Sequence, residues 1–280
     1  MKVSVIGGGT MGNGIAQVFA QHGHDVNLID VKPEFLERAM GTIEKNLGRM
    51  VKKEKISQDD ATATLGRVKP VVGLANAADS DLVVEAVFEN YEVKKEIFTK
   101  LDEVCQPGAI LASNTSSISL TKIAACTGRP ESVIGMHFMN PVPIMKLVEI
   151  ICGHATGDET LAKVTQMAKD LGKVPVTVQD YPGFIANRLL MPMINEAAYC
   201  LMEGVADREA IDTVMKLGMA HPMGPLTLAD FIGLDICLDI MEVLYDGFGD
   251  SKYRPCPLLR RMVDAGYLGR KSGRGFYEYE

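Results

Sequence analysis

Two ionisable side chains lie near a proline-rich turn in the stretch Met136–Ile150. His137 ends one apolar run, and Glu149 ends a second run that follows Pro141 and Pro143. Such runs are typical of buried strands, which can bring an imidazole and a carboxylate together at one sheet edge. An imidazole oriented by a carboxylate is a general acid/base near neutral pH. The alternative at this point is that His137 is a hydrogen-bonded core histidine and Glu149 an exposed strand end.

A glycine-rich turn near the N-terminus could bind a nucleotide. The turn has the spacing GxGxxG and consists of Gly7, Gly8, Gly9, Thr10, Met11 and Gly12. It follows a β-rich run and opens a helical pattern, as dinucleotide binding requires. In such a turn the first glycine permits the bend, the second lets the backbone approach a pyrophosphate, and the third allows close helix packing. The N-terminal amides of the helix then face the phosphates.

An acidic residue at the end of the second predicted strand bears on the choice of cofactor. Asp30 is at the distance from the glycine turn where a carboxylate can accept hydrogen bonds from the adenosine ribose. This favours NAD over NADP, because a 2′-phosphate would meet a like charge. Lys32 could partly offset that repulsion. The sequence therefore predicts NAD as the cofactor, with NADP less favoured.

Further polar residues follow two predicted strands. Glu89 and Lys94 come after the run Leu82–Val87, and the segment 113–117 (Ser-Asn-Thr-Ser-Ser) follows a run at 110–112. Loops at the carboxyl ends of parallel strands are where doubly wound folds bind ligands. Alternatively, Ser116 or Ser117 caps a helix. Asn187 lies early in an apolar helical segment, where its amide would need partners from the other domain or a ligand.

These residues have to be positioned by two regions of different character. Up to about residue 180, short β-rich runs alternate with helical patterns, which predicts a mostly parallel sheet with helices on both faces. The expected strands are 3–6, 26–29, 68–72, 82–87, 110–112 and 174–178, besides the two runs around His137 and Glu149. After residue 180 the segments 184–203, 207–217 and 226–244 read as long helices. We therefore expect an α/β Rossmann-type domain over 1–180 and an all-α domain over 181–280.

Composition excludes several classes of function. The 280 residues are 47% hydrophobic and carry a net charge of −7, which argues against binding nucleic acid or a membrane surface. Six scattered cysteines show neither metal-ligand spacing nor a disulfide framework. No apolar stretch reaches the length of a membrane span. A strand begins almost at once, so we expect no signal peptide and a cytoplasmic protein.

At this point the chain resembles the 3-hydroxyacyl-CoA dehydrogenase family, and its bacterial 3-hydroxybutyryl-CoA dehydrogenases most closely. The resemblance runs over essentially the whole chain. It is carried by GGGTMG, DLVVEAVFEN, ASNTSS, GMHFMNPVPIMKLVEI, PGFIANRLL, LGMAHPMGPLTLAD and GRKSGRGFYEY, in this order.

The resemblance implies interconversion of acetoacetyl-CoA and (S)-3-hydroxybutyryl-CoA with NAD(H), in a cleft between the two domains. It implies that His137 is the acid/base, that Glu149 orients it, and that Ser116 and Asn187 hold the substrate oxygen. The positions that match family contacts to NAD are Asp30, Glu89, Lys94, Asn140 and Lys271, with Ser116 close to both ligands. The helical domain would form a homodimer.

The resemblance also bears on coenzyme A. The basic segment 45–55 matches the family's helix near the CoA nucleotide, and Lys53 falls at a matching position. Asn46 replaces a family serine that contacts CoA, which puts that contact in doubt. The alternative for each lysine is a solvated helix face.

Three other functions compete with this interpretation. One is a longer-chain 3-hydroxyacyl-CoA dehydrogenase, because the sequence does not set the acyl length or the direction of reaction. Another is a dehydrogenase of free β-hydroxyacids, although that class relies on a lysine base in its second domain. The last is a crystallin-like NAD-binding relative with little activity.

Overall fold

The computed structural model describes residues 1–279 and divides into two compact units, Met1–Asp180 and Tyr181–Glu280. The first unit is an α/β fold around one eight-stranded sheet, with strand order β3-β2-β1-β4-β5-β6-β7-β8. Its strands are β1 (Lys2–Ile6), β2 (Asp25–Asp30), β3 (Val68–Val72), β4 (Leu82–Glu85), β5 (Ile110–Ser113), β6 (Val133–Phe138), β7 (Leu147–Cys152) and β8 (Val174–Gln179). All neighbouring pairs are parallel except β6 and β7, which are antiparallel.

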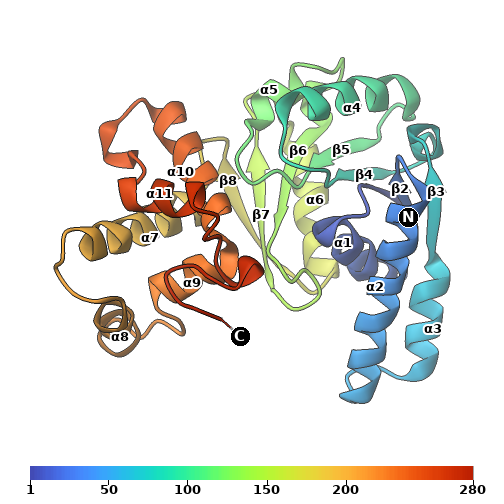
Figure 1. Ribbon diagram of the computed structural model, residues 1–280. Coiled ribbons are helices and arrows are strands. Elements are labelled where there is room, and N and C mark those ends of the chain that lie inside the picture. The colour runs from blue at the N-terminus through green and yellow to red at the C-terminus, as the bar shows by residue number, and fades with distance from the viewer. Residues whose placement is uncertain (280) are drawn as a thin grey trace. The chain divides into compact units, whose positions relative to one another are not determined.

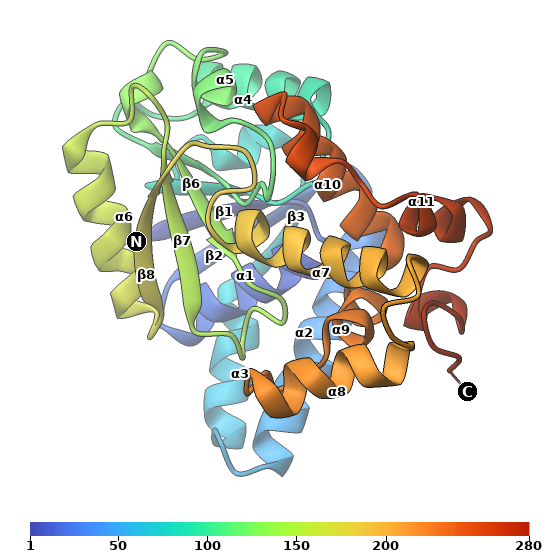
Figure 2. The ribbon, with the colours of Figure 1, turned by 90° about the vertical axis from the view of Figure 1, so that its left-hand side faces the viewer.

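Helices cover both faces of this sheet (Figure 1). They are α1 (Thr10–Gln21), α2 (Pro33–Lys52), α3 (Gln58–Arg67), α4 (Tyr91–Val104), α5 (Leu120–Ala124) and α6 (Asp158–Asp170). Helices α1, α2 and α6 share one apolar core with the sheet, and α6 runs alongside β8 (Figure 2). Helices α4 and α5 pack on each other on the opposite face.

The alternation of side chains along the strands explains this layering. Val3 and Val5 of β1 belong to the core beneath α1, whereas Ser4 between them hydrogen-bonds Ser80 at 2.8 Å. Successive strand residues point to opposite faces, so a strand covered on both sides is buried throughout. Strand β4 is buried at all four positions. Strand β4 thus ends in a buried carboxylate, Glu85.

The second unit is built from helices: α7 (Ala186–Met202), α8 (Arg208–Gly218), α9 (Pro225–Ile232), α10 (Leu234–Phe248) and α11 (Pro257–Asp264). They enclose a separate apolar core. The predicted α/β Rossmann-type domain followed by an all-α domain is confirmed. Among the described helices, in residues 1–279, none combines the length and apolar character needed to cross a bilayer.

One predicted helix is wrong. The segment 226–244 is two helices, α9 and α10, separated at Gly233. Gly233 has a φ of 109°, a backbone conformation that residues with a side chain rarely adopt, so the chain turns there. A Cβ at this position would also lie 2.9 Å from the Asp235 carboxylate.

A buried carboxylate fixes the C-terminal segment of the second unit. Asp230 on α9 accepts hydrogen bonds from the backbone amides of Phe276 and Tyr277, both at 2.8 Å, and from the Tyr279 hydroxyl at 2.9 Å. A Cβ at Gly275 would lie 1.9 Å from Asp230, so only glycine allows this approach. Asp230 therefore ties the end of the chain to the helical core.

Candidate functional site

The glycine turn joins β1 to α1 in a conformation that other residues could not share. Gly7 has a φ of 104°, and a Cβ there would lie 2.7 Å from the Ala86 carbonyl oxygen. A Cβ at Gly12 would lie 1.8 Å from the Gly7 carbonyl oxygen. Gly9, by contrast, faces open space, and α1 begins beyond it without a side-chain cap. The first amides of α1 are thus available to an anion.

Asp30 ends β2 beside this turn. Its carboxylate accepts hydrogen bonds from the amides of Gly8 at 2.6 Å and Val31 at 2.7 Å. A cavity of about 580 Å³ runs from the glycine turn past Asp30 to the loop after β4. Phe35, with Arg38 4.8 Å above its ring, lines the same cavity. The glycine turn without side chains, the Asp30 carboxylate and the cavity lined by Phe35 together fit a dinucleotide.

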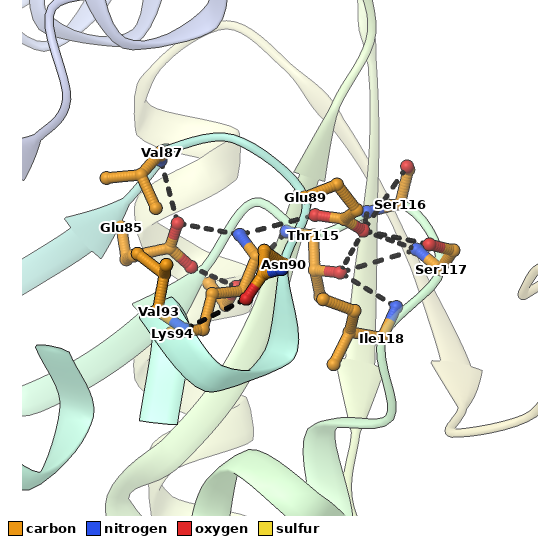
Figure 3. A network of polar contacts seen from close by, with 11 residues as sticks. Glu85, Val87, Glu89, Asn90, Val93, Lys94, Thr115, Ser116, Ser117 and Ile118 are labelled. Atoms are coloured by element: carbon orange, nitrogen blue, oxygen red, sulfur yellow. Dashed lines mark hydrogen bonds and ion pairs between the residues drawn. The ribbon is translucent and has the colours of Figure 1, made fainter. Parts of the chain in front are cut away.

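Two carboxylates and one ammonium meet at the end of β4 (Figure 3). The Lys94 ammonium lies 2.7 Å from Glu85 and 3.3 Å from Glu89, and only 1% of the lysine side chain is exposed. Glu85 also accepts hydrogen bonds from Ser113 Oγ at 2.6 Å and from the Val87 amide at 2.8 Å. Glu85 was not among the residues predicted from the sequence. A single charged residue closing the apolar run at 82–85, nine residues before a lysine, was the available signal.

Glu89 holds the loop that follows β5 (Figure 3). One of its oxygens accepts hydrogen bonds from the amides of Ser116 and Ser117, both at 2.9 Å, and from the hydroxyls of Thr115 and Ser117. The capping alternative for these serines is not what the structure shows, since Ser119 caps α5. Burial opposes ionisation of Glu89, but Lys94 and these hydrogen bonds outweigh it, and its pKa lies below the ordinary value.

The histidine–glutamate pair is formed by cross-strand neighbours. His137 on β6 lies directly opposite Glu149 on β7, and its Nδ1 is 2.8 Å from the Glu149 carboxylate. Both residues are buried. Glu149 lies inside β7 rather than at its end, because β7 continues to Cys152. Two positions before His137, Gly135 faces Ile151, and a Cβ at Gly135 would lie 2.8 Å from the Cβ of Ile151.

The serine loop and the histidine strand are directly linked. The Asn114 side chain accepts a hydrogen bond from the amide of Phe138 at 2.9 Å. Phe138 follows His137, and Asn114 precedes Thr115, which donates to Glu89. The first unit therefore brings Glu89, Ser116, His137 and Glu149 into one connected arrangement at the carboxyl ends of β4, β5 and β6.

The other predicted site residues lie in separate places. Asn140 is exposed after β6, Asn46 is half-buried on α2 with its amide 3.4 Å from Gln17, and Lys53 is exposed at the end of α2. In the second unit, Asn187 is buried in the first turn of α7. Lys271 forms an ion pair with Asp235 at 2.5 Å.

A doubly wound sheet with this glycine turn and an imidazole–carboxylate pair defines an NAD-dependent dehydrogenase. Comparison with known proteins narrows the class. Residues 2–181 match the NAD-binding domain of 3-hydroxyacyl-CoA dehydrogenase, and residues 183–279 match the C-terminal domain of the same enzyme. The chain belongs to the 3-hydroxyacyl-CoA dehydrogenase family.

Individual proteins of this family match the chain over nearly their whole length. The chain is 60% identical to a probable 3-hydroxybutyryl-CoA dehydrogenase from Deinococcus radiodurans, covering 100% of both chains. It is 56% identical to a 3-hydroxybutyryl-CoA dehydrogenase from Bradyrhizobium diazoefficiens, covering 99% of this chain and 95% of the other. The crystal structure of (S)-3-hydroxybutyryl-CoA dehydrogenase from Ralstonia eutropha matches with a TM-score of 0.97 at 50% identity, over 100% and 99% of the two chains.

Proposed function

We propose that this chain interconverts acetoacetyl-CoA and (S)-3-hydroxybutyryl-CoA with NAD(H). The observation that carries the proposal is the buried pair of His137 and Glu149, 2.8 Å apart on adjacent strands. The names of relatives at 50–60% identity support the short acyl chain. Bound NAD supplies the acceptor for the substrate's hydride.

His137 is the proposed acid/base. Glu149 engages Nδ1, so it fixes the ring orientation and the tautomer, and Nε2 becomes the atom that exchanges a proton with the substrate. In the oxidative direction Nε2 takes the proton of the 3-hydroxyl as C3 becomes a ketone. In the reductive direction the imidazolium, stabilised by the Glu149 carboxylate, returns that proton to the ketone oxygen. A positioned acid/base contributes roughly 10²–10⁴-fold in rate.

The remaining site residues are assigned by the same proposal. Ser116 and Asn187 hold the substrate oxygen. The cofactor is bound by the glycine turn from Gly7 to Gly12 and by Asp30, whose charge disfavours a 2′-phosphate. The other cofactor positions are Glu89, Lys94, Asn140 and Lys271.

Two further assignments concern the substrate and the assembly. The basic C-terminal end of α2, with the exposed Lys53 just beyond it and the half-buried Asn46, is proposed to lie along the CoA nucleotide, because lysine ammonium groups attract phosphates. The helical unit is proposed to form the homodimer. Sedimentation of the purified chain at micromolar concentration tests the dimer independently of activity.

The proposed function is tested by steady-state kinetics with acetoacetyl-CoA and longer 3-ketoacyl-CoAs, each with NADH and NADPH. We expect the highest kcat/KM with acetoacetyl-CoA and NADH. His137→Gln should lower kcat by roughly 10²–10⁴-fold and leave the Kd for NADH near the parent value. His154→Gln is the matched control, because His154 is exposed. Near-parental kcat in His137→Gln would contradict the acid/base assignment, and a clear preference for NADPH would contradict the role of Asp30.

A further inference from the structure

We propose that Glu89 is a positioning residue that sets the place of Ser116 by holding the backbone of the loop 115–117. The inference rests on the proposed function, in which Ser116 holds the substrate oxygen. It gives Glu89 a task within the protein, beyond contact with the cofactor. Glu89 reaches the loop from the neighbouring β4–α4 connection, so hydrogen bonds join the two loops after β4 and β5.

The contacts show that Glu89 acts on the backbone of the loop. The amides of Ser116 and Ser117 both donate to Glu89 Oε1 at 2.9 Å. The Ser116 hydroxyl lies much farther from this oxygen, at 3.5 Å, which is the limit of a hydrogen bond. The hydroxyls of Thr115 and Ser117, on either side, also donate to it. Ser116 is therefore held by its amide and by both neighbours, while its hydroxyl is only weakly restrained by Glu89.

The partners of Glu89 favour an ionised carboxylate. Within residues 1–279, Glu89 accepts hydrogen bonds from two amides and from hydroxyls of the loop, and the Lys94 ammonium lies 3.3 Å away. A carboxylate offers only acceptors, whereas a glutamine would turn an NH₂ group toward one of these donors. Lys94 is in turn held by Glu85, which also accepts from Ser113 at the end of β5. The loop is thus anchored at both its start and its centre.

A double-mutant cycle tests whether Glu89 acts through Ser116. Glu89→Ala should lower kcat by roughly 10–100-fold, because a small displacement of an orienting group is costly in rate. In the Ser116→Ala background, Glu89→Ala should lower kcat by a further factor of less than about 3, because the hydroxyl that Glu89 positions is already absent. Loss of the proposed cofactor contact in Glu89→Ala should raise the Kd for NADH, measured by fluorescence titration, but kcat measured at saturating NADH should still fall by roughly 10–100-fold. Glu89→Gln should keep part of the activity, since its amide oxygen still accepts from the two loop amides.

The matched control is Glu92→Ala, since Glu92 is an exposed residue in the first turn of α4. It should leave kcat and the NADH Kd at parental values. Equal losses from Glu89→Ala in the parent and in Ser116→Ala would overturn the proposal. So would a loss of NADH affinity that accounts for the whole effect, because Glu89 would then act only on the cofactor. A kcat loss in Glu89→Ala with none in Ser116→Ala would overturn it as well.

Hydrogen exchange tests the anchor without any activity. In the parent, the amides of Ser116 and Ser117 should exchange slowly, and Glu89→Ala should speed their exchange by at least about 10-fold while Glu92→Ala leaves it unchanged. Unchanged exchange in Glu89→Ala would refute the positioning role even if the enzyme used acetoacetyl-CoA. Faster exchange in a protein with no such activity would uphold the anchor and reject the proposed function.

Discussion

Two carboxylates, the partly buried Glu89 in the first unit and the buried Asp230 in the second, each accept hydrogen bonds from two consecutive backbone amides of another segment. Glu89 receives the amides of Ser116 and Ser117, and Asp230 receives the amides of Phe276 and Tyr277. The difference is the cation. Glu89 lies beside Lys94, whereas the hydrogen bonds that Asp230 accepts within residues 1–279 come from amides and a tyrosine hydroxyl.

The pKa values of the two groups move in opposite directions. For Asp230, burial raises the pKa and the Asp212 carboxylate adds to that increase, which its two amides and Tyr279 do not fully offset. For Glu89, burial acts in the same direction, but Lys94 and the loop donors bring the pKa below its ordinary value. Backbone donors alone can thus hold a carboxylate in position, while a nearby cation lowers its pKa and so stabilises its ionised form.

Removing the cation should give the largest effect. Lys94→Met leaves Glu85 fully buried and Glu89 partly buried without their counterion, and should lower the free energy of unfolding by about 3–5 kcal/mol at neutral pH. Urea unfolding followed by circular dichroism measures this loss. The control is Lys95→Met, at the exposed neighbouring position. If the two variants lose equally little, below about 1 kcal/mol, Lys94 is not what separates the two carboxylates.

Removing the Asp230 carboxylate should lower the free energy of unfolding by less than removing Lys94. Asp230→Ala leaves the amides of Phe276 and Tyr277 without their acceptor and should destabilise the protein by about 2–3 kcal/mol. The loss should appear as faster trypsin cleavage at Arg274, because the C-terminal segment is released. Asp246→Ala, at an exposed site on α10, should leave the cleavage rate unchanged. Protection at Arg274 as strong as in the parent would argue against Asp230 as the anchor.

The dependence of stability on pH is the smallest expected effect. It tests directly whether the pKa values of Glu89 and Asp230 shift in opposite directions. Because the pKa of folded Glu89 is below its ordinary value of 4.5, its contribution to stability is complete above that value and is lost as the pH falls further. Because the pKa of folded Asp230 is above 3.8, the folded state holds that proton more tightly and gains stability as the pH falls toward 3.8.

Urea unfolding of the parent, Glu89→Gln and Asp230→Asn from about pH 7 to about pH 4 and below measures both contributions. The deficit of Glu89→Gln relative to the parent should shrink on acidification, and that of Asp230→Asn should grow. Deficits that change in the same direction would show that the cation does not distinguish the two sites.

Local patterns predicted the glycine turn and the strand that ends at Asp30. The glycine turn and Asp30 could be read from the sequence because the turn depends on steric limits that only glycine meets. The pairing of His137 with Glu149 was also predicted, although Glu149 lies within its strand. Their distance follows from an antiparallel register that no local pattern displays.

What was missed depends on contacts between distant segments or on a single backbone angle. Gly233 looked like one residue inside a long helix, and only its positive φ shows that the helix ends there. Helices α3, α5, α6 and α11 were not predicted, and of these α5 and α11 have only 5 and 8 residues. The roles of Glu85 and Glu89 arise from partners up to 28 residues away, at Ser113 and Ser117.

The antiparallel pairing of β6 and β7 restricts which residues can face each other, and so fixes the pairing of His137 with Glu149. Side chains alternate along a strand, so a pairing shifted by one residue would send Glu149 to the face opposite His137. Gly135 helps to fix this register, because only a residue without a side chain fits against Ile151. An insertion of one residue within either strand would therefore turn the His137 imidazole and the Glu149 carboxylate to opposite faces of the sheet.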